Sequence, residues 1–406
     1  MSHHRRRPSS PSPELAHPLD DDDLLHEIML RLPPQPPYLL RVSILSNRWR
    51  RLATDPKFLR RLRIHHGKPP LLGVFSCTCG DISFRSTLDA PYRIPPERFS
   101  PRPPIRSIQT CLDVRHGRVL IECIMRSQSQ VIVWDPITDD RRVVAFPPQF
   151  LRAGIVHIHS GAVLCADGDQ GHVHGACHSS PFKVVVITSY QHDDDLFDED
   201  DDYEPVVFAS VYSSETGEWS DLILTTVPAR GMDFSLRSTL VGNTLHWPLK
   251  WNSPFILEFD LEAQSLTVTQ RPPGAPSRDD NAQIIIQAED GGIGFAALSG
   301  PCLQLWDRKV DSHGVATWVL QKTVELQKIL GLGSWIENNK SSILNYVEDV
   351  NAILLRARSS VYMVWLETLQ SKKLFESNFM CIYRPFTSFY TEGVFSSLKQ
   401  KQLITG

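Results

Sequence analysis

The chain has 406 residues, of which 41% are hydrophobic and 22% charged, and its formal net charge is −4. This composition is ordinary for a soluble globular protein, and the length is sufficient for two or three domains. The small negative charge gives no general argument for nucleic acid, and no apolar run approaches the roughly 18 residues that cross a bilayer. We therefore expect neither nucleic acid nor a membrane among the partners.

Residues 1–18 are basic and then rich in Ser and Pro, without the apolar core of a secretory signal. This pattern predicts a disordered tail. The eight cysteines are scattered over the chain. Without a signal peptide we expect them to be reduced thiols, in a protein of the cytoplasm, the nucleus or both.

A compact helical segment is predicted at 19–66. Four aspartates, Asp20–Asp23, suit the N-terminus of a first helix, and Pro33 with Pro34 ends it. An apolar stripe on this helix is formed by Leu24, Leu25, Ile28 and Leu32.

Three more helices follow within the same segment. The second begins after Pro36-Pro37 and includes Leu40; the third places Leu45, Trp49 and Leu52 on one face. Asp55-Pro56 is an N-cap followed by proline at the first helical position, which predicts a fourth helix. So small a core is marginal alone.

Residues 69–400 repeat a weak pattern of an apolar strand ending in an aromatic residue, a polar turn and another strand. The aromatic positions are Trp134, Tyr212, Phe259, Trp306 and Trp365, with spacings of 78, 47, 47 and 59 residues. Most copies have two further strands upstream. Four strands at a period near 47 are typical of a β-propeller blade.

Five complete blades are expected to end near 147, 225, 271, 328 and 376. A sixth would form from residues 71–86 and 378–395, which would close the ring and remove exposed edges. We therefore predict a multidomain fold, a small helical domain followed by an all-β propeller of about six four-stranded blades. Seven blades, or an open β-sandwich with irregular repeats, are the alternatives.

The helical segment resembles an F-box. Its pattern is an apolar helix, a Leu-Pro-Pro, a Leu-Arg-rich helix and a basic pair beside Trp, over about 48 residues. The matching positions are Leu24, Leu25, Glu27, Ile28, Arg31, Leu32, Pro33, Leu40, Arg41, Arg48, Trp49, Arg50, Asp55, Pro56 and Phe58. Aspartates replace the usual Leu-Pro opener, and Ser46 stands for a common cysteine. The whole chain resembles the plant F-box proteins with an associated β-propeller.

That resemblance implies a non-catalytic substrate receptor of a Skp-cullin-F-box (SCF) ubiquitin ligase. The F-box would bind a Skp-type adaptor and through it a cullin, while propeller loops would bind an unknown protein target for ubiquitination. The expected adaptor-binding residues are Leu24, Leu25, Ile28, Leu32, Pro33, Leu40, Leu45, Trp49 and Leu52. Residues 41–68 hold nine Lys or Arg and one acidic residue, Asp55, which would steer docking on an acidic adaptor. The alternatives are an interaction scaffold without ubiquitin transfer and a propeller enzyme.

Other motifs are weaker, and we expect no cofactor, metal or catalytic residue. The segment 157–178 holds His157, His159, Cys165, His172, His174, Cys177 and His178, but no C-x-x-C or H-x-x-x-H spacing frames a closed zinc site. Gly292 and Gly294 approach a dinucleotide fingerprint, yet their surroundings predict a hairpin.

Nine carboxylates lie in residues 193–204, and this run predicts a solvated insertion at 192–204. The basic segment at 41–63 could also be a DNA-recognition helix. Against this, Trp49 and Leu52 would lie on the core side, prolines interrupt the neighbouring helices, and the rest of the chain brings no basic surface.

Overall fold

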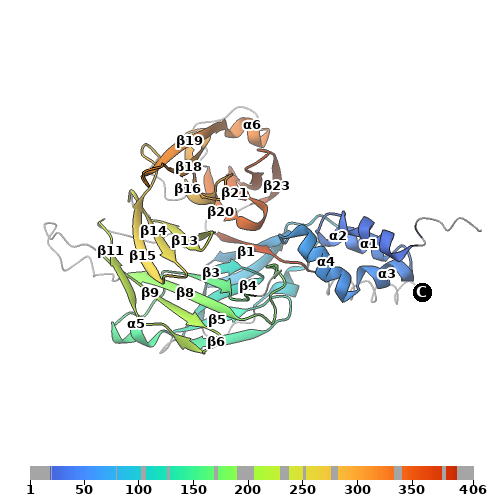
Figure 1. The fold of residues 1–406 in the computed structure, drawn as a ribbon, viewed down its shortest axis with the longest axis horizontal. Coiled ribbons are helices and arrows are strands. Elements are labelled where there is room, and N and C mark those ends of the chain that lie inside the picture. The colour runs from blue at the N-terminus through green and yellow to red at the C-terminus, as the bar shows by residue number, and fades with distance from the viewer. Residues whose placement is uncertain are drawn as a thin grey trace, which may run out of the picture. The chain divides into compact units, whose positions relative to one another are not determined.

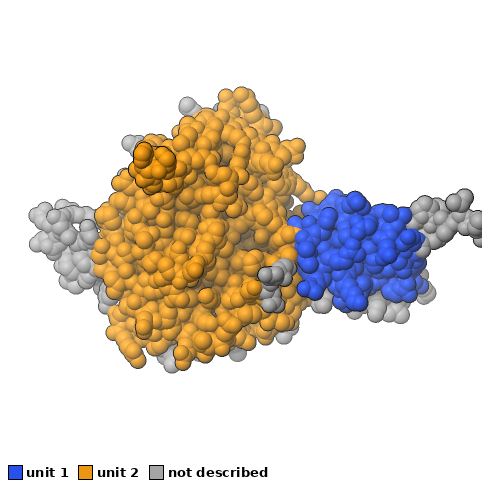
Figure 2. Space-filling view, in the orientation of Figure 1, with its two compact units in different colours: residues 1–66, 391–406 blue, residues 67–390 orange. Residues whose placement is uncertain are grey.

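The structure is a computed structural model. It describes residues 19, 21–78, 80–101, 107–125, 129–168, 172–189, 205–228, 237–249, 253–275, 282–332, 341–376 and 381–390. The chain divides into two compact units, which Figure 2 colours blue for residues 1–66 and 391–406 and orange for residues 67–390. The expected tail at 1–18 and the acidic insertion at 192–204 lie outside the described residues.

The described part of the first unit forms four helices, shown in blue in Figure 1. They are α1 (Asp22–Leu30), α2 (Pro36–Ser43), α3 (Asn47–Ala53) and α4 (Pro56–His66). Local capping sets their starts: the Asp21 carboxylate accepts from the backbone N–H of Asp23 at 2.8 Å, and the Ser46 hydroxyl accepts from that of Trp49 at 3.2 Å. These bounds confirm the four predicted helices.

One apolar core holds this unit together. Phe58 of α4 is 1% exposed and stacks on the His26 ring, with centroids 5.2 Å apart. The buried side chains around it are Leu25, Met29, Leu30, Leu39, Leu52, Ala53 and Leu62. The apolar stripe expected on α1 is therefore divided, since Leu25 turns inward with Met29 and Leu30 while Leu24 and Ile28 stay exposed. Helical periodicity alone does not tell which of two adjacent apolar rows packs on the other helices.

The second unit is a six-bladed β-propeller, as predicted. In Figure 1 its sheets run from cyan through green and yellow to red. The four-stranded sheets are β3 (Ile108–Arg115), β4 (Arg118–Ile124), β5 (Ser129–Trp134) and β6 (Arg141–Ala145); β12 (Thr239–Val241), β13 (Thr244–Pro248), β14 (Phe255–Asp260) and β15 (Ser265–Gln270); β16 (Gln283–Gln287), β17 (Ile293–Ser299), β18 (Cys302–Val310) and β19 (Ala316–Glu325); and β20 (Ser342–Val347), β21 (Ala352–Ala357), β22 (Ser360–Trp365) and β23 (Ser371–Glu376).

The two remaining sheets depart from four strands. One contains β7 (Ser160–Cys165), β8 (Phe182–Ser189) and β9 (Val206–Ser213), and β9 pairs at its outer edge with both β10 (Glu218–Trp219) and β11 (Ile223–Thr226). The other has three strands, β2 (Asp81–Ser86), β1 (Leu71–Thr78) and β24 (Ile382–Thr387). Four short helical turns of the described chain lie between strands: η2 (Pro96–Phe99), α5 (Pro148–Arg152), α6 (Leu326–Leu330) and η4 (Glu348–Val350).

The three-stranded sheet closes the ring. Its central strand β1 pairs antiparallel with β24, from the C-terminal part of the chain, and Phe75 lies opposite Arg384. This confirms the predicted pairing of residues 71–86 with the C-terminal strand. Closure covers the strand edges that an open sheet would expose.

Apolar side chains fill the spaces between neighbouring blades. Within the described chain, five interfaces each hold an aliphatic-rich cluster, and the sixth holds aromatic rings, including Phe75 against Trp134 at 5.8 Å. Trp134, Tyr212, Phe259 and Trp306, which marked the repeat in the sequence, are all buried. The repeated aromatic residue therefore serves packing between blades.

The glycines of the dinucleotide-like motif lie on a hairpin, as expected. Gly291 forms the turn before β17 with φ of 85°, and a Cβ at Gly294 would lie 2.9 Å from the Ile286 side chain. No helix follows, so the segment lacks the strand-to-helix geometry that holds a pyrophosphate. None of the helices in the described ranges is long and apolar enough to cross a membrane.

A buried carboxyl group makes the stability of the propeller depend on pH. Glu122 of β4 is 3% exposed and accepts one hydrogen bond, from the backbone N–H of Ile158 at 3.0 Å. Burial raises its pKa to about 7. In the unfolded chain Glu122 releases its proton near the ordinary pKa of a glutamate, whereas in the folded state it keeps the proton up to about pH 7. The protonated carboxyl is compatible with burial and the carboxylate is not, so the free energy of unfolding decreases as the pH rises through 7.

We expect Glu122→Gln to stabilise the propeller increasingly between pH 5 and pH 8. Gln can keep the acceptor for Ile158 without ionising, and the gain should approach about 2–3 kcal/mol above pH 7. Urea unfolding of both proteins at a series of pH values measures it. A stability difference that does not change with pH would contradict this assignment.

Candidate functional site

Helix α1 presents two large apolar side chains to solvent. Leu24 and Ile28 are 40% and 38% exposed and lie one turn apart on the same face. Their neighbours Leu25 and Met29 are fully buried, so the helix is apolar on both its inner and outer faces. A solvent-facing apolar row on a helix of a folded unit is typical of a surface that a partner covers.

The junction between α2 and α3 presents a second apolar group. Ile44 and Leu45 follow the last turn of α2 and are 55% and 65% exposed. Leu45 was expected on the face of α3 with Trp49, but it precedes Ser46, the N-cap of that helix, and points outward. Because Ser46 is the N-cap, α3 begins at Asn47 and Leu45 lies before the helix rather than on its apolar face.

The remaining expected adaptor-binding residues fall into two sets. Leu25, Leu40 and Leu52 are buried in the helical unit, which corrects their assignment as surface contacts. Leu32 and Trp49 are half-buried and pack against the core, and Pro33 is exposed. Periodicity identified apolar positions correctly, but only the packing of four helices separates inner from outer ones.

Ion pairs within the unit neutralise part of its basic charge. Arg48 of α3 donates from Nε and Nη2 to Asp22 of α1 at 2.8 and 2.5 Å. Arg61 of α4 pairs with Glu27 at 2.7 Å. Asp22, one of the aspartates that replace the usual opener, thus binds a basic side chain of the same unit. Less positive charge is left to meet a partner than the sequence count indicates.

The propeller has a buried ionic cluster where four blades meet. Arg115 of β3 donates to Asp113 at 2.6 Å and, through Nε and Nη2, to Glu348 at 3.0 and 2.8 Å. Glu348 also accepts from the backbone N–H of Leu240 in β12, and Asp113 accepts from that of Val163 in β7. Burial raises the pKa of Asp113, although the Arg115 guanidinium opposes this. The cluster joins strands far apart in the sequence.

A small cavity adjoins this cluster, lined by Asp113, Arg115, Glu348 and Arg384 among others. Its volume is about 30 Å³, which accommodates one or two water molecules rather than an organic substrate. Arg115 binds the Asp113 and Glu348 carboxylates beside it, which favours a structural role for these charged groups. Sequence reasoning missed this cluster because its charged residues follow no local motif.

Three histidines of the 157–178 segment have separate positions. His157 is exposed, and His159 lies against the Thr188 hydroxyl with Nδ1 at 2.8 Å. His178 pairs with Asp135 at 2.6 Å. The other His and Cys residues of this segment converge, although their spacing in the sequence predicted no closed metal site, and are treated below.

Two family models match the chain. The F-box domain model covers residues 21–61, and a model described as "F-box protein AT5G49610-like, beta-propeller" covers residues 110–390. The second match spans more than half of the chain. The protein belongs to the F-box proteins with an AT5G49610-like β-propeller.

Solved structures similar to this F-box propeller protein are remote. A periplasmic gluconolactonase of Pseudomonas aeruginosa is 12% identical, with a TM-score of 0.41 over 76% of this chain and 83% of that one. TolB from Acinetobacter baumannii is 12% identical, with a TM-score of 0.37 over 84% and 70%. The Aleuria aurantia lectin is 11% identical, with a TM-score of 0.33 over 80% and 100%. A comparison with curated proteins gave no match.

An F-box joined to a propeller is the architecture of a substrate receptor. The F-box domain implies binding to a Skp-type adaptor, and the propeller implies a protein substrate. Such F-box propeller proteins are generally adaptors without catalytic activity of their own. The exposed apolar groups of α1 and of the α2–α3 junction are accessible to another protein.

Proposed function

We propose that this protein is the substrate-recognition subunit of an SCF-type E3 ubiquitin ligase. The observation that carries the proposal is the exposed pair Leu24 and Ile28 on the first helix of an F-box. The exposure of these side chains to solvent is unfavourable, because removing apolar surface from water contributes roughly 25 cal/mol of free energy per Å². An adaptor that covers them would gain that free energy on binding.

The exposed members of the expected set form the adaptor contact in this proposal. Leu24, Ile28 and Leu45 meet the partner directly, with Pro33 at the end of the first helix. Leu25, Leu40 and Leu52 hold the helices in position from the core. Basic side chains without an internal acidic partner would orient an acidic adaptor through long-range attraction.

Ubiquitin transfer would then follow from proximity. The adaptor would connect the F-box to a cullin and its RING-type subunit, while propeller loops bind the target. Holding a target lysine near a charged ubiquitin carrier raises its effective concentration, so this chain needs no catalytic group. The free thiols of the seven described cysteines agree with a reducing compartment, and we propose the cytoplasm or the nucleus as the location.

The first test is co-purification of the full-length chain with a Skp-type adaptor. We expect Ile28→Asp to weaken adaptor binding at least about 100-fold, because an unpaired carboxylate would be buried at the interface. Ile64→Asp is the matched control: Ile64 is 50% exposed on α4, outside the proposed contact. Wild type and this control should bind alike. Equal binding by Ile28→Asp would contradict the proposed surface.

A second measurement separates the ligase from an interaction scaffold. The chain, adaptor, cullin and RING-type subunit are mixed with the ubiquitin-charging enzymes, and ubiquitin on the chain itself is followed. A ligase subunit should acquire ubiquitin in the wild type and lose it with Ile28→Asp. Adaptor binding without any ubiquitin transfer would favour the scaffold.

A further inference from the structure

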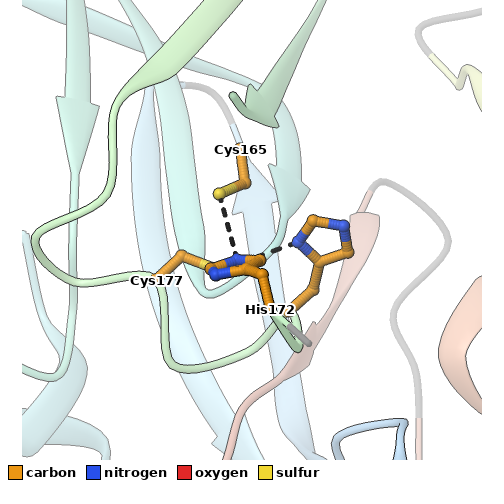
Figure 3. Close-up of side chains that lie close together, drawn as sticks. Cys165, His172 and Cys177 are labelled. Carbon is orange, nitrogen blue, oxygen red and sulfur yellow. Dashed lines mark hydrogen bonds between the residues drawn. The ribbon is translucent and has the colours of Figure 1, made fainter. Parts of the chain in front are cut away.

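Four metal-binding side chains converge at one end of the β7–β8 blade. Cys165 is the last residue of β7, and His172, His174 and Cys177 lie in the connection to β8. One ligand atom from each lies within 4.8 Å of all the others. Figure 3 shows Cys165, His172 and Cys177 pointing toward one another. Sequence spacing gave no sign of this, because six residues separate the first cysteine from the first histidine.

The distances between these atoms fit a tetrahedral metal centre. His172 Nε2 lies 3.3 Å from Cys165 Sγ and 3.2 Å from Cys177 Sγ, and His174 Nδ1 lies 3.7 Å from Cys177 Sγ. A zinc ion with Zn–S near 2.3 Å and Zn–N near 2.0–2.1 Å would hold its ligand atoms roughly 3.3–3.8 Å apart. The side chains therefore need only small adjustments to bind one ion.

Hydrogen bonding alone does not account for the cluster. An imidazole nitrogen carries either one hydrogen or one lone pair, but His172 Nε2 faces two sulfur atoms at nearly equal distances. Two neutral thiols are weak donors and weak acceptors. A single cation at a shared point would satisfy all four ligand atoms together.

The surroundings supply a second, independent observation. His172 places its other nitrogen, Nδ1, 3.1 Å from Asp167 Oδ2, and that same carboxylate oxygen accepts from the Ser180 hydroxyl at 2.6 Å. Zinc-bound histidines usually donate their second N–H to a carboxylate in this way, which fixes the tautomer and the ring orientation. Asp167 is thus placed to leave Nε2 free for a metal.

Neighbouring groups also hold the ligands in position. The His116 ring stacks on His174 with centroids 3.8 Å apart, and its Nδ1 accepts from the backbone N–H of Cys165 at 3.0 Å. The Cys177 carbonyl accepts a hydrogen bond from Arg118. Between two of the ligands, the Gly175 carbonyl accepts from the backbone N–H of Phe389 at 3.0 Å. Ligands that are held before a metal arrives lose little conformational entropy on binding it.

We propose that Cys165, His172, His174 and Cys177 form a structural zinc site. Two thiolates and two imidazoles are the ligand set of closed tetrahedral zinc centres, and two thiolate charges balance one Zn²⁺. The ion would tie the β7–β8 connection to the end of β7, and the Gly175 carbonyl of this connection also accepts hydrogen bonds from the segment at 388–389. The site has no role in adaptor binding and does not depend on the proposed ligase function.

The test measures the metal content of the full-length chain after purification under reducing conditions. Wild type should contain one zinc ion per chain, and Cys165→Ser/Cys177→Ser should contain only background zinc. Cys302→Ser is the matched control, because Cys302 lies on β18 outside the cluster, and it should keep its zinc. Asp167→Asn should keep the ligands but bind zinc about 10–100-fold more weakly in a chelator competition.

Cobalt replacement keeps the test valid if the double variant does not fold. Wild-type protein stripped by a chelator and loaded with Co²⁺ should show thiolate-to-metal charge transfer and the intense visible bands of a tetrahedral ion. Folded wild type with background zinc and no such spectrum would overturn the proposal. So would a Cys165–Cys177 disulfide in the reduced preparation, or full zinc content in the double variant.

Discussion

Replacing Arg115 with methionine is expected to destabilise the propeller by about 3–5 kcal/mol. The side chain is 6% exposed and binds Asp113 and Glu348, whose carboxylates belong to different blades. Methionine fills a similar length but leaves both carboxylates without their cation. The cost comes mainly from buried charges that lose their partner. The variant should unfold at markedly lower denaturant concentration, and part of it should be insoluble.

An exposed ion pair provides the control for this experiment. Lys322 pairs with Glu289 at 2.6 Å on the propeller surface, and the two side chains are 39% and 73% exposed. Lys322→Met should change the free energy of unfolding by about 0–1 kcal/mol. Urea unfolding followed by tryptophan fluorescence compares both variants with wild type. Equal effects would show that the buried cluster contributes no more than a surface pair.

Truncating Phe58 to alanine is expected to unfold the helical unit while the propeller stays folded. The ring is 1% exposed at the centre of the only core that the described part of this unit possesses. Removing a buried Phe costs about 3–5 kcal/mol, which is comparable to the total stability of so small a domain. Adaptor binding should be lost for a reason different from that of Ile28→Asp.

Two measurements distinguish these reasons. Far-ultraviolet circular dichroism should show less helix in Phe58→Ala but not in Ile28→Asp, and limited proteolysis should cut only the former within residues 21–66. Ile64→Ala on the same helix should behave as wild type, because its side chain is half exposed. Retained helix and retained adaptor binding in Phe58→Ala would mean that the core is more tolerant than its packing indicates.

Much of the architecture is local in origin and could be predicted from the sequence. Asp21 and Ser46 cap helices through contacts two or three residues away, so the starts of α1 and α3 follow from adjacent residues. The blades repeat one strand pattern, and each strand pairs mainly with its neighbour in the chain. Even the closing pair of β1 and β24 was predictable, since a blade left incomplete at one end must be completed from the other.

Functional detail depended on contacts that no local pattern encodes. Leu24 and Leu25 are adjacent and equally apolar, yet the first is exposed and the second is fully buried. The difference comes from how α1 packs on the other helices. Arg115 and Glu348 are 233 residues apart and meet only because the ring closes.

The cysteine and histidine cluster shows the same division. The sequence by itself determined the F-box helices, the blade repeat and a segment rich in His and Cys. Only the tertiary structure brought Cys165 at a strand end to His172, His174 and Cys177 in a returning loop, and excluded His157, His159 and His178 from the group. Secondary structure follows from interactions between near neighbours, whereas a binding site requires side chains to converge in space, which the packing of the whole domain decides.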